Sequence, residues 1–263
     1  MSILITGSTG FLGRNLLNSL KKNYSLLAPP KKQLDLLSAT SVEQYFKQNK
    51  IDTIIHCAIT GGSRLKKDCL EHFVTNMTMY ENLMLVKETD TTFINFDSGA
   101  SENPNTYYGA SKRLISENLK ARGNVYNLRV FGCFGKDEPD TRFIKSTILK
   151  MLAKEDLQLD RNKFMDFFHI EDLVLVVKNI LKRRYHFGYV PLDLVYRKKY
   201  TLYDIAKLLK GEVGYLRELG ATPPPCSSYI GVNSEHTIYA GIFTFEVRLK
   251  QVCNEIREDF RRA

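Results

Sequence analysis

The chain has 263 residues, 43% of them hydrophobic and 25% charged, which suits one α/β domain with a smaller appended lobe. No apolar run approaches the roughly 20 residues that cross a bilayer, and no signal peptide is expected, so the composition favours a cytoplasmic protein with no membrane partner. The net charge of +9 is spread along the chain without a basic motif interleaved with aromatics, so it indicates a lysine-rich surface or a cleft for an anionic substrate rather than a nucleic-acid partner.

Strand-like and helix-like stretches alternate over the first two thirds of the chain. Short apolar runs predict strands over 2–6, 24–28, 52–57, 92–96 and 125–130. Amphipathic stretches predict helices between them, over 11–22, 41–48, 66–87 and 106–121. Because strands separated by crossover helices pair in parallel, the pattern predicts an α/β fold with a doubly wound parallel sheet of the Rossmann type.

The last third of the chain is less regular. Helices are predicted over 141–153, 171–183, 201–209 and 244–261, and a proline run predicts a loop at 222–225. We therefore expect a Rossmann domain over 1–160, to which 166–195 return, and a small C-terminal substrate-binding lobe over 196–263.

Cysteine and histidine usage bears on disulfides and metals. The five cysteines are widely spaced and form no C-x-x-C motif, so we expect free thiols in a reducing compartment. The five histidines form no pair at metal-ligand spacing, so we expect no metal.

A glycine-rich segment, G-S-T-G-F-L-G over residues 7–13, joins the first predicted strand directly to the first helix. Gly7 permits the tight turn, Gly10 lets backbone approach a pyrophosphate, and Gly13 lets the helix pack close to the sheet. The pyrophosphate would lie on backbone N–H groups at the positive end of the helix. The segment predicts a dinucleotide site formed by Gly7, Thr9, Gly10, Phe11, Leu12, Gly13 and Arg14. A plain glycine-rich turn is the alternative.

The second predicted strand indicates which dinucleotide binds. An NAD enzyme usually places a carboxylate there for the ribose 2′-hydroxyl, but this strand is followed by two prolines and then Lys31 and Lys32. These lysines, or Arg14, would favour a 2′-phosphate. We predict NADP(H), with NAD(H) as the alternative if the lysines are only solvated loop residues.

Tyr108 and Lys112 are spaced i, i+4 on a predicted helix, so they lie on one face, a turn apart. A phenol with a pKa of about 10 is a poor acid near neutrality, and a neighbouring ammonium lowers that pKa. Tyr108 could then exchange a proton with a reacting oxygen. Ser98, at the end of the preceding strand, would hydrogen-bond that oxygen, with Ser101 as the alternative.

The G-x-x-G-x-x-G spacing, the Y-x-x-x-K pair and the upstream serine resemble the extended short-chain dehydrogenase/reductase family, also called the NAD-dependent epimerase/dehydratase family. Its members act largely on nucleotide sugars. The resemblance implies that Lys112 also holds the nicotinamide ribose and that Asp35, in a Leu-Asp-Leu segment, meets the adenine. It implies further that Ala58 lines the cofactor and that Asn76 has a structural role.

The resemblance extends to roughly residue 210, with two departures. Residues 128–132 resemble the family's strand exit near the nicotinamide, but Gly132 stands where an asparagine is usual. Residues 166–172 resemble its D-F-x-H-V-D-D motif, but Met165 replaces the usual arginine, a common contact to nucleotide phosphates.

The reaction is narrowed by the residues after Ser98. Family dehydratases carry Asp-Glu there, whereas this chain has Gly99 and Ala100, which disfavours water elimination. The chain most resembles the GDP-fucose synthases and other nucleotide-sugar 4-ketoreductases. The cysteine and histidine that epimerise in GDP-fucose synthases match Ala100 and Arg142, so that epimerisation is not expected.

The resulting hypothesis is NADPH-dependent reduction of the 4-keto group of a nucleotide-linked (6-deoxy) sugar. Tyr108 protonates the oxygen and Ser98 orients it, while Arg142 and Lys145 are candidates for holding the substrate's diphosphate. An exposed basic helix face is the alternative for those two residues. Alternative functions are a nucleotide-sugar C4-epimerase or 4-dehydrogenase, and a non-catalytic dinucleotide-sensing regulatory protein. The resemblance also implies a homodimer that pairs the helices at 66–87 and 106–121.

Overall fold

The computed structural model describes residues 1–63, 65–157, 159, 161–182, 191–214, 227–231 and 243–262, and the backbone of 237–239. The chain divides into two compact units, Met1–Arg129 with Val177–Leu192, and Val130–Val176 with Asp193–Ala263. The division differs from the expected domains in placing 130–160 in the second unit, and the expected boundaries stay a prediction. The predicted loop at 222–225 lies outside the described residues.

The first unit is built on a parallel sheet. Its strands are β1 (Ser2–Thr6), β2 (Ser25–Leu27), β3 (Thr53–His56), β4 (Thr92–Ser98) and β5 (Val125–Val130), in the spatial order β5-β4-β3-β1-β2. β1 pairs in parallel with β2 and β3, and β3 pairs in parallel with β4. β3 and most of β1 and β4 are buried along their length, which is why they read as near-continuous apolar runs.

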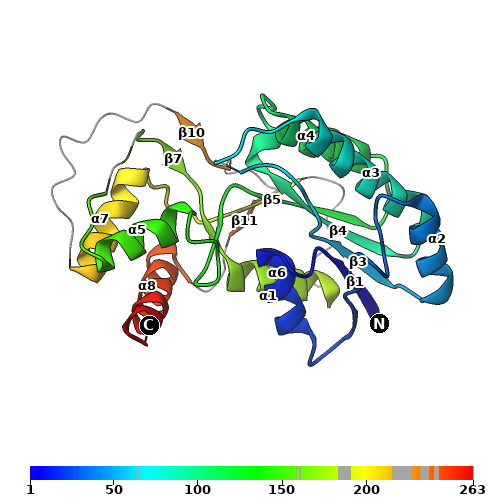
Figure 1. The fold of residues 1–263 in the computed structure, drawn as a ribbon, viewed down its shortest axis with the longest axis horizontal. Helices are drawn as coiled ribbons and strands as arrows, with labels where there is room; N and C mark the ends of the chain where they lie inside the picture. Colours follow the sequence, from blue (N-terminus) through cyan, green and yellow to red (C-terminus); the bar gives the residue numbers. More distant parts are fainter. Residues whose placement is uncertain are drawn as a thin grey trace. The chain divides into compact units, whose positions relative to one another are not determined.

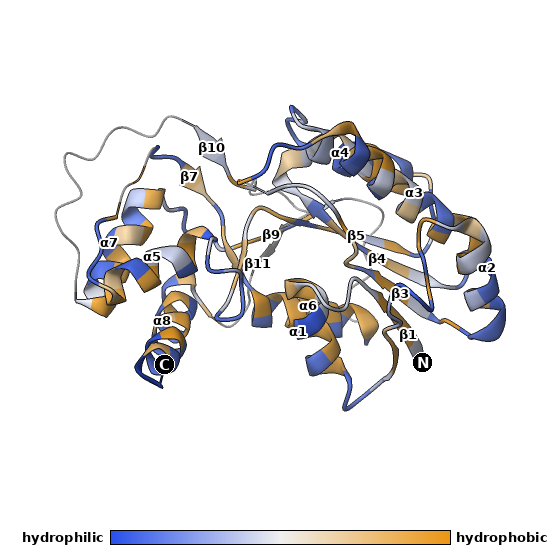
Figure 2. Cartoon of the chain, viewed as in Figure 1, coloured by the Kyte–Doolittle hydropathy of each residue, from blue (hydrophilic) through white to orange (hydrophobic). Residues whose placement is uncertain are grey.

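Helices cover both faces of this sheet, as Figure 1 shows. Helix α1 (Phe11–Leu20) lies on one face, and α2 (Ala39–Gln48), α3 (Leu70–Val86) and α4 (Tyr107–Leu119) lie on the other. An apolar core, visible as the orange strands and inner helix faces in Figure 2, fills the space between the sheet and the second group and includes Ile54, Tyr80 and Phe93. The predicted α/β fold with a Rossmann-like parallel sheet is confirmed.

Local hydrogen bonds set where these helices begin. The hydroxyl of Ser38 accepts from the N–H of Ser41 at the start of α2, and that of Thr106 accepts from the N–H of Gly109 at the start of α4. Helix α3 begins at Leu70 rather than at the predicted 66. The preceding residues belong to a loop in which the Asp68 carboxylate accepts a hydrogen bond from the N–H of Gly62.

The second unit and its connections combine helices with short strands. In chain order they are β6 (Cys133–Phe134), α5 (Phe143–Leu152), β7 (Phe164–Met165), β8 (Phe168–His169), α6 (Ile170–Leu181), β9 (Leu192–Val195), α7 (Leu202–Val213), β10 (Ser228–Tyr229), β11 (Thr237–Tyr239) and α8 (Phe245–Arg262). Helices α5, α7 and α8 pack against one another. The sequence predicted none of these six strands, four of which have only two residues.

Helix α7 continues beyond the predicted 209 and stops at Gly214, whose φ of +84° is left-handed. In the part of the chain that the structure describes, no helix combines the length and apolar character needed to cross a membrane.

Candidate active site

The glycine turn after β1 is closed by backbone on two sides. Gly7 has a φ of +62°, and a Cβ there would lie 2.6 Å from the N atom of Ala58. A Cβ on Gly13 would lie 2.3 Å from the carbonyl oxygen of Gly7. Only glycine fits at these two positions, so the predicted tight turn and close helix packing are both present.

Gly10 is the N-cap residue of α1 and caps it without a side-chain hydrogen bond. The first turn of α1 also carries no acidic residue, so its N–H groups face no negative side chain of their own helix. Phe11 and Leu12 belong to this turn, and Arg14 follows on the exposed side of α1. A phosphate is the ligand that such a helix start attracts.

A hollow of about 330 Å³ opens beside the glycine turn. Five predicted cofactor residues line it together: Gly7, Thr9, Lys31, Asp35 and Ala58. Sequence reasoning missed the rest of the lining, notably the apolar side chains of Leu34, Leu36 and Met79. The hollow therefore combines an apolar wall with polar groups at its rim, as a binding site for a nucleoside requires.

Lys31 and Asp35 meet at this hollow. Their charged groups lie 3.9 Å apart, with 74% and 38% of the side chains exposed, so the pair is weak. Asp35 also accepts a hydrogen bond from the N–H of Leu37 at 3.1 Å, which fixes the loop after β2. Both side chains can be reached by a ligand.

Polar residues form a row across the sheet just before its strands end. Thr6, His56 and Asn95 are register partners on β1, β3 and β4, and Asn95 donates a hydrogen bond to Asn127 on β5. The Thr6 hydroxyl contacts His56 Nδ1 at 2.9 Å and accepts from the N–H of Ala58 at 3.2 Å. The hydrogen bond from Ala58 to Thr6 thereby fixes the backbone of Ala58, which faces Gly7. No sequence motif indicated this row.

His56 is neutral in this row. Burial, and then the positive charge of Lys112, lower the pKa of His56 to about 3. An imidazole in that state is a hydrogen-bonding spacer and carries no charge at neutral pH.

The predicted pair of Tyr108 and Lys112 lies at the start of α4. Lys112 is 6% exposed, and its Nζ donates to the carbonyl oxygen of Phe96 at 2.5 Å. The same Nζ lies 5.8 Å from the centroid of the Tyr108 ring. Burial lowers the pKa of Lys112 to about 8, while the negative charge of Asp97 acts to raise it. The ammonium therefore persists at neutral pH beside the phenol ring.

Ser98 ends β4 and begins a short 3-10 turn, η1 (Gly99–Ser101). Its hydroxyl is buried and accepts from the N–H of Ala100 at 3.2 Å. A Cβ on Gly109 would lie 2.8 Å from the carbonyl oxygen of Ala100, so the first turn of α4 packs directly on η1. This close approach places the segment of Ser98 beside the segment of Tyr108.

Ser101, the alternative to Ser98, is occupied differently. Its hydroxyl lies 2.8 Å from the Asp97 carboxylate and 2.8 Å from the carbonyl oxygen of Ser98, and it is 2% exposed. A hydroxyl has one proton to donate, so it is held inside the turn. The geometry favours Ser98 for contact with a reacting oxygen.

Asp97, which the sequence reading did not select, is the central anion of this turn. It is 3% exposed, and its Oδ2 accepts from Arg129 Nε at 3.2 Å and from Ser101. Arg129 in turn meets Glu102 at 2.6 Å, so η1 is tied to β5 from both ends. Burial raises the pKa of Asp97, and the N–H of Ser98 and the charges of Arg129 and Lys112 oppose that shift.

Asn76 has the structural role that the resemblance implied. Its Oδ1 accepts from the N–H of Thr60 at 2.9 Å, and its Nδ2 donates to the Thr60 carbonyl at 3.0 Å and to the Ser111 hydroxyl at 3.1 Å. The Ser111 hydroxyl donates to the carbonyl of Tyr108 at 2.8 Å. One asparagine on α3 thus joins the loop after β3 to the turn of α4 that carries Tyr108.

Arg142 and Lys145 belong to the second unit. Arg142 is exposed and is the N-cap residue of α5. Lys145 Nζ pairs with Asp140 at 2.8 Å and donates to the Glu138 carbonyl at 3.1 Å. Lys145 is therefore engaged within its own segment, and a role of either residue toward a diphosphate stays a prediction.

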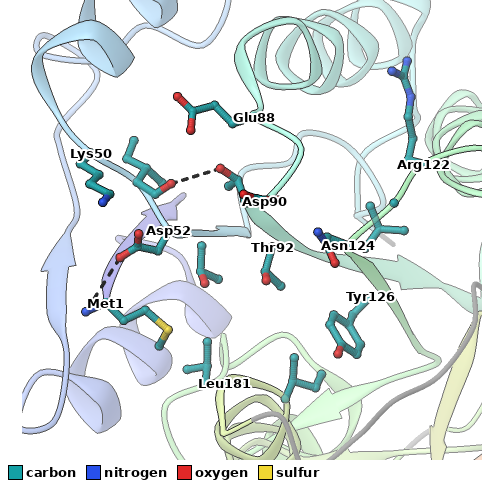
Figure 3. Close-up of a pocket in the computed structure, with 16 residues that line it drawn as sticks. Met1, Lys50, Asp52, Glu88, Asp90, Thr92, Arg122, Asn124, Tyr126 and Leu181 are labelled. Atoms are coloured by element: carbon teal, nitrogen blue, oxygen red, sulfur yellow. Dashed lines mark hydrogen bonds and ion pairs between the residues drawn. The ribbon is translucent and has the colours of Figure 1, made fainter.

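A larger hollow, of about 1210 Å³, lies at the opposite edge of the first unit's sheet, where the strands begin (Figure 3). Charged side chains of both signs line it, among them Lys50, Asp52, Asp90 and Arg122. Asp52 is 39% exposed and pairs with the amino group of Met1 at 3.8 Å. None of the residues predicted for the site lies at this edge.

The residues at the carboxyl edge fit a nicotinamide dinucleotide. The glycine cradle would be filled by any Cβ at Gly7 or Gly13, and the hollow beside it suits a nucleoside. The buried ammonium of Lys112 lies 5.8 Å from the ring centroid of Tyr108 in the same unit, close enough to stabilise an ionised phenol. Among the described residues, no three His, Cys, Asp or Glu side chains gather as metal ligands would, and the expectation of no metal stays a prediction.

Comparisons with known proteins agree with this chemistry. The chain matches the model of the "NAD dependent epimerase/dehydratase family" over residues 3–187. CDP-abequose synthase from Salmonella muenchen is 28% identical over 236 residues, 80% of this chain and 80% of that protein. GDP-L-fucose synthase from Azorhizobium caulinodans is 32% identical over 101 residues, 36% of this chain and 32% of that protein.

A solved structure shares the fold over nearly the whole length. GDP-mannoheptose C4 reductase from Campylobacter jejuni, with NADP bound, superposes with a TM-score of 0.74 at 15% identity, covering 98% of both chains. Since the family match spans residues 3–187, a range that contains the glycine turn, Ser98, Tyr108 and Lys112, this chain belongs to the NAD-dependent epimerase/dehydratase family and is an NAD(P)-dependent oxidoreductase.

Proposed function

We propose that the protein reduces the 4-keto group of a nucleotide-linked 6-deoxy sugar with NADPH. The observation that carries the proposal is the buried Lys112 ammonium, 5.8 Å from the ring centroid of Tyr108 and anchored on the backbone of β4 just before Ser98. Reduction needs a proton donor and a group that orients the carbonyl oxygen, and these three residues supply both.

We assign the following roles. NADPH supplies the hydride when it is bound. Tyr108 gives its proton to the substrate oxygen, and the Lys112 ammonium stabilises the phenolate that remains. The Ser98 hydroxyl orients the substrate oxygen. The glycine turn and the first turn of α1 would hold the pyrophosphate, and the hollow lined by Asp35 and Ala58 would hold the adenosine.

The preference for NADPH rests on the loop after β2. This strand ends at Leu27, and Lys31 at the rim of the hollow is 74% exposed, so its ammonium is available to a 2′-phosphate. Asp35 lies beside it and weakens that field, which is why the preference is expected to be moderate. The C4 reductase with the same fold was solved with NADP.

The substrate class is supported by the relatives. Three of them are named as synthases of CDP-abequose, GDP-L-colitose and GDP-L-fucose. The Gly99-Ala100 pair after Ser98 offers no acid or base for dehydration. Arg142 and Lys145 are proposed as contacts to the substrate's diphosphate.

The test is NADPH oxidation, followed at 340 nm, with 4-keto-6-deoxy sugars linked to GDP, CDP, UDP and dTDP. One of these substrates should be reduced, and Tyr108→Phe should abolish turnover while NADPH still binds. Interconversion of 4-hydroxyl epimers with no net NADPH consumption would replace the proposal by a C4-epimerase. Cofactor binding without turnover of any sugar would indicate a dinucleotide sensor.

A homodimer in the cytoplasm completes the proposal. Leu70, Val74 and Leu85 are more than half exposed and recur on one face of α3, and Leu114 on α4 is 48% exposed. Such an apolar surface suits a second copy of the chain. The four described cysteines are free thiols, as in a reducing compartment. Sedimentation of the wild type and of Val74→Glu tests the dimer.

A further inference from the structure

A glycine turn after β3 lies against the ring of Tyr108. Gly61 and Gly62 both have left-handed φ values, +82° and +71°. A Cβ on Gly62 would lie 3.0 Å from Cε1 and Cζ of the Tyr108 ring. No side chain fits between this backbone and the ring, so the backbone itself packs on the phenol.

The turn is held from the start of α3. The N–H of Gly62 donates to Asp68 Oδ1 at 2.8 Å, and the Asp68 side chain is 8% exposed. His72 Nδ1 lies 3.5 Å from the same oxygen. A hydrogen bond to a carboxylate is among the stronger ones in proteins, and the side chain that accepts this one is largely buried.

Asp68 and Tyr108 lie at the starts of two helices that pack against each other. Asp68 directly precedes Cys69, the N-cap residue of α3, and α3 packs against α4. Asn76 fastens the two helices together by its hydrogen bond to Ser111. The carboxylate and the phenol ring are therefore carried by the same pair of helices, and the glycine turn bridges them.

Two successive glycines need such a restraint. A glycine chain samples many conformations, so a turn with two left-handed residues is not maintained by its own backbone preferences. Without the Asp68 contact the turn would be free to leave the ring. The ring would then lose the packing that fixes its direction relative to Lys112.

We infer that Asp68 is a positioning residue for Tyr108, acting through the Gly61–Gly62 turn to hold the phenol in one orientation before substrate binds. The inference rests on the proposed function, in which Tyr108 is the proton donor. Asp68 itself touches neither the predicted cofactor hollow nor the reacting atoms.

The first test uses activity. Asp68→Ala should lower kcat about tenfold and leave KM for NADPH unchanged, because misplacing a reacting group costs rate rather than cofactor binding. Asp68→Asn keeps an oxygen that accepts from Gly62 and should restore kcat to within about twofold. Glu71→Ala, an exposed acid in the first turn of α3, is the matched control and should match the wild type.

Two outcomes of this test would overturn the inference. One is an Asp68→Ala enzyme with the kcat of Glu71→Ala. The other is an Asp68→Asn enzyme as slow as Asp68→Ala, since the charge rather than the hydrogen bond to the turn would then matter.

The second test needs no substrate. Tyrosine labelled with 13C at Cζ gives one ring signal per residue, and Tyr108→Phe identifies that of Tyr108. Asp68→Ala and Gly62→Ala should both shift or broaden this signal, and Glu71→Ala should not. An unmoved signal in both variants would overturn the inference even if ketosugar reduction is found.

If circular dichroism shows that Asp68→Ala does not fold, the Gly62→Ala variant is used as the only test of the signal. If no ketosugar is reduced, the proposed function fails, while this test still decides how the ring is held.

Discussion

Each edge of the parallel sheet in the first unit has a hollow lined by exposed charged side chains, but the carboxyl edge also carries buried charges outside its hollow. At the amino edge the hollow is about 1210 Å³, and Asp52 is 39% exposed (Figure 3). At the carboxyl edge the hollow is about 330 Å³, and Lys112 and Asp97 are almost fully buried.

Under the proposed function, the reacting groups therefore lie at the edge with the smaller hollow. Exposed charges are screened by water and keep ordinary behaviour. Buried charges depend on a few fixed partners, as Lys112 depends on the Phe96 carbonyl and the nearby Asp97. Parallel strands also direct every strand-to-helix turn, including the glycine turn, to the carboxyl edge. Pairs of substitutions, one at each edge, test whether the two edges differ in this way.

The largest difference in kcat is expected between substitutions of Lys112 and of Lys50. Lys112→Met should lower kcat by about 10³-fold, because the phenol loses the ammonium that stabilises its ionised form. Single-turnover oxidation of NADPH with the identified ketosugar measures it. Lys50→Met at the amino edge should turn over like the wild type, and equal rates for the two variants would remove the distinction between the edges.

The second-largest difference is expected between substitutions of Gly13 and Gly123. A Cβ on Gly13 would meet the Gly7 carbonyl oxygen at 2.3 Å, whereas a Cβ on Gly123 at the amino edge would meet no atom within 4 Å. Gly13→Ala should therefore destabilise the fold by about 1–3 kcal/mol and weaken NADPH binding. Urea unfolding and fluorescence titration of NADPH measure these effects. A Gly13→Ala protein with the stability and affinity of Gly123→Ala would contradict the close packing of α1.

Replacing the buried carboxylate of Asp97 should change the pH dependence of kcat. The charge of Asp97 raises the pKa of Lys112 against the effect of burial, so Asp97→Asn lowers that pKa further below about 8. The ammonium is then lost at lower pH, and the basic limb of kcat moves to lower pH. The loss of kcat should be on the order of fivefold larger at pH 9 than at pH 7. Asp90→Asn is the matched control, and a basic limb in Asp97→Asn that coincides with the control would refute the coupling.

The smallest effect is expected at the exposed cations. Lys31→Ala should reduce the ratio of kcat/KM for NADPH over NADH by roughly twofold to fivefold, because an exposed lysine contributes about 1 kcal/mol or less. Arg122→Ala, which lines the amino-edge hollow, should leave the ratio unchanged. A wild-type enzyme that prefers NADH would show that Lys31 does not select the cofactor.

Residues close in sequence were the predictable part of the site. Tyr108 and Lys112 share a helix face by spacing alone, and the glycine turn follows from its place between a strand and a helix. The sequence selected Ser98 and left Ser101 as the alternative. The structure favours Ser98, because the Ser101 hydroxyl is held by Asp97 and the Ser98 carbonyl.

Contacts between distant residues were not predictable. Thr6 and His56 are 50 positions apart and meet only because β1 and β3 are neighbours in register. Asp97 and Arg129 meet in the same way across β4 and β5. The amphipathic pattern placed Asp68 in the predicted helix. In the structure its carboxylate accepts from the N–H of Gly62, and α3 begins only at Leu70.

The parallel α/β architecture, the glycine turn and the helical spacing of Tyr108 and Lys112 are predictable from the chain alone, because they depend on local periodicity and on glycine's freedom near one turn. The packed fold alone reveals which charges are buried, which partners shift the pKa of Lys112, and which backbone packs on Tyr108. Desolvation and hydrogen-bond partners depend on how separate strands and helices come together, and no spacing along the chain encodes that.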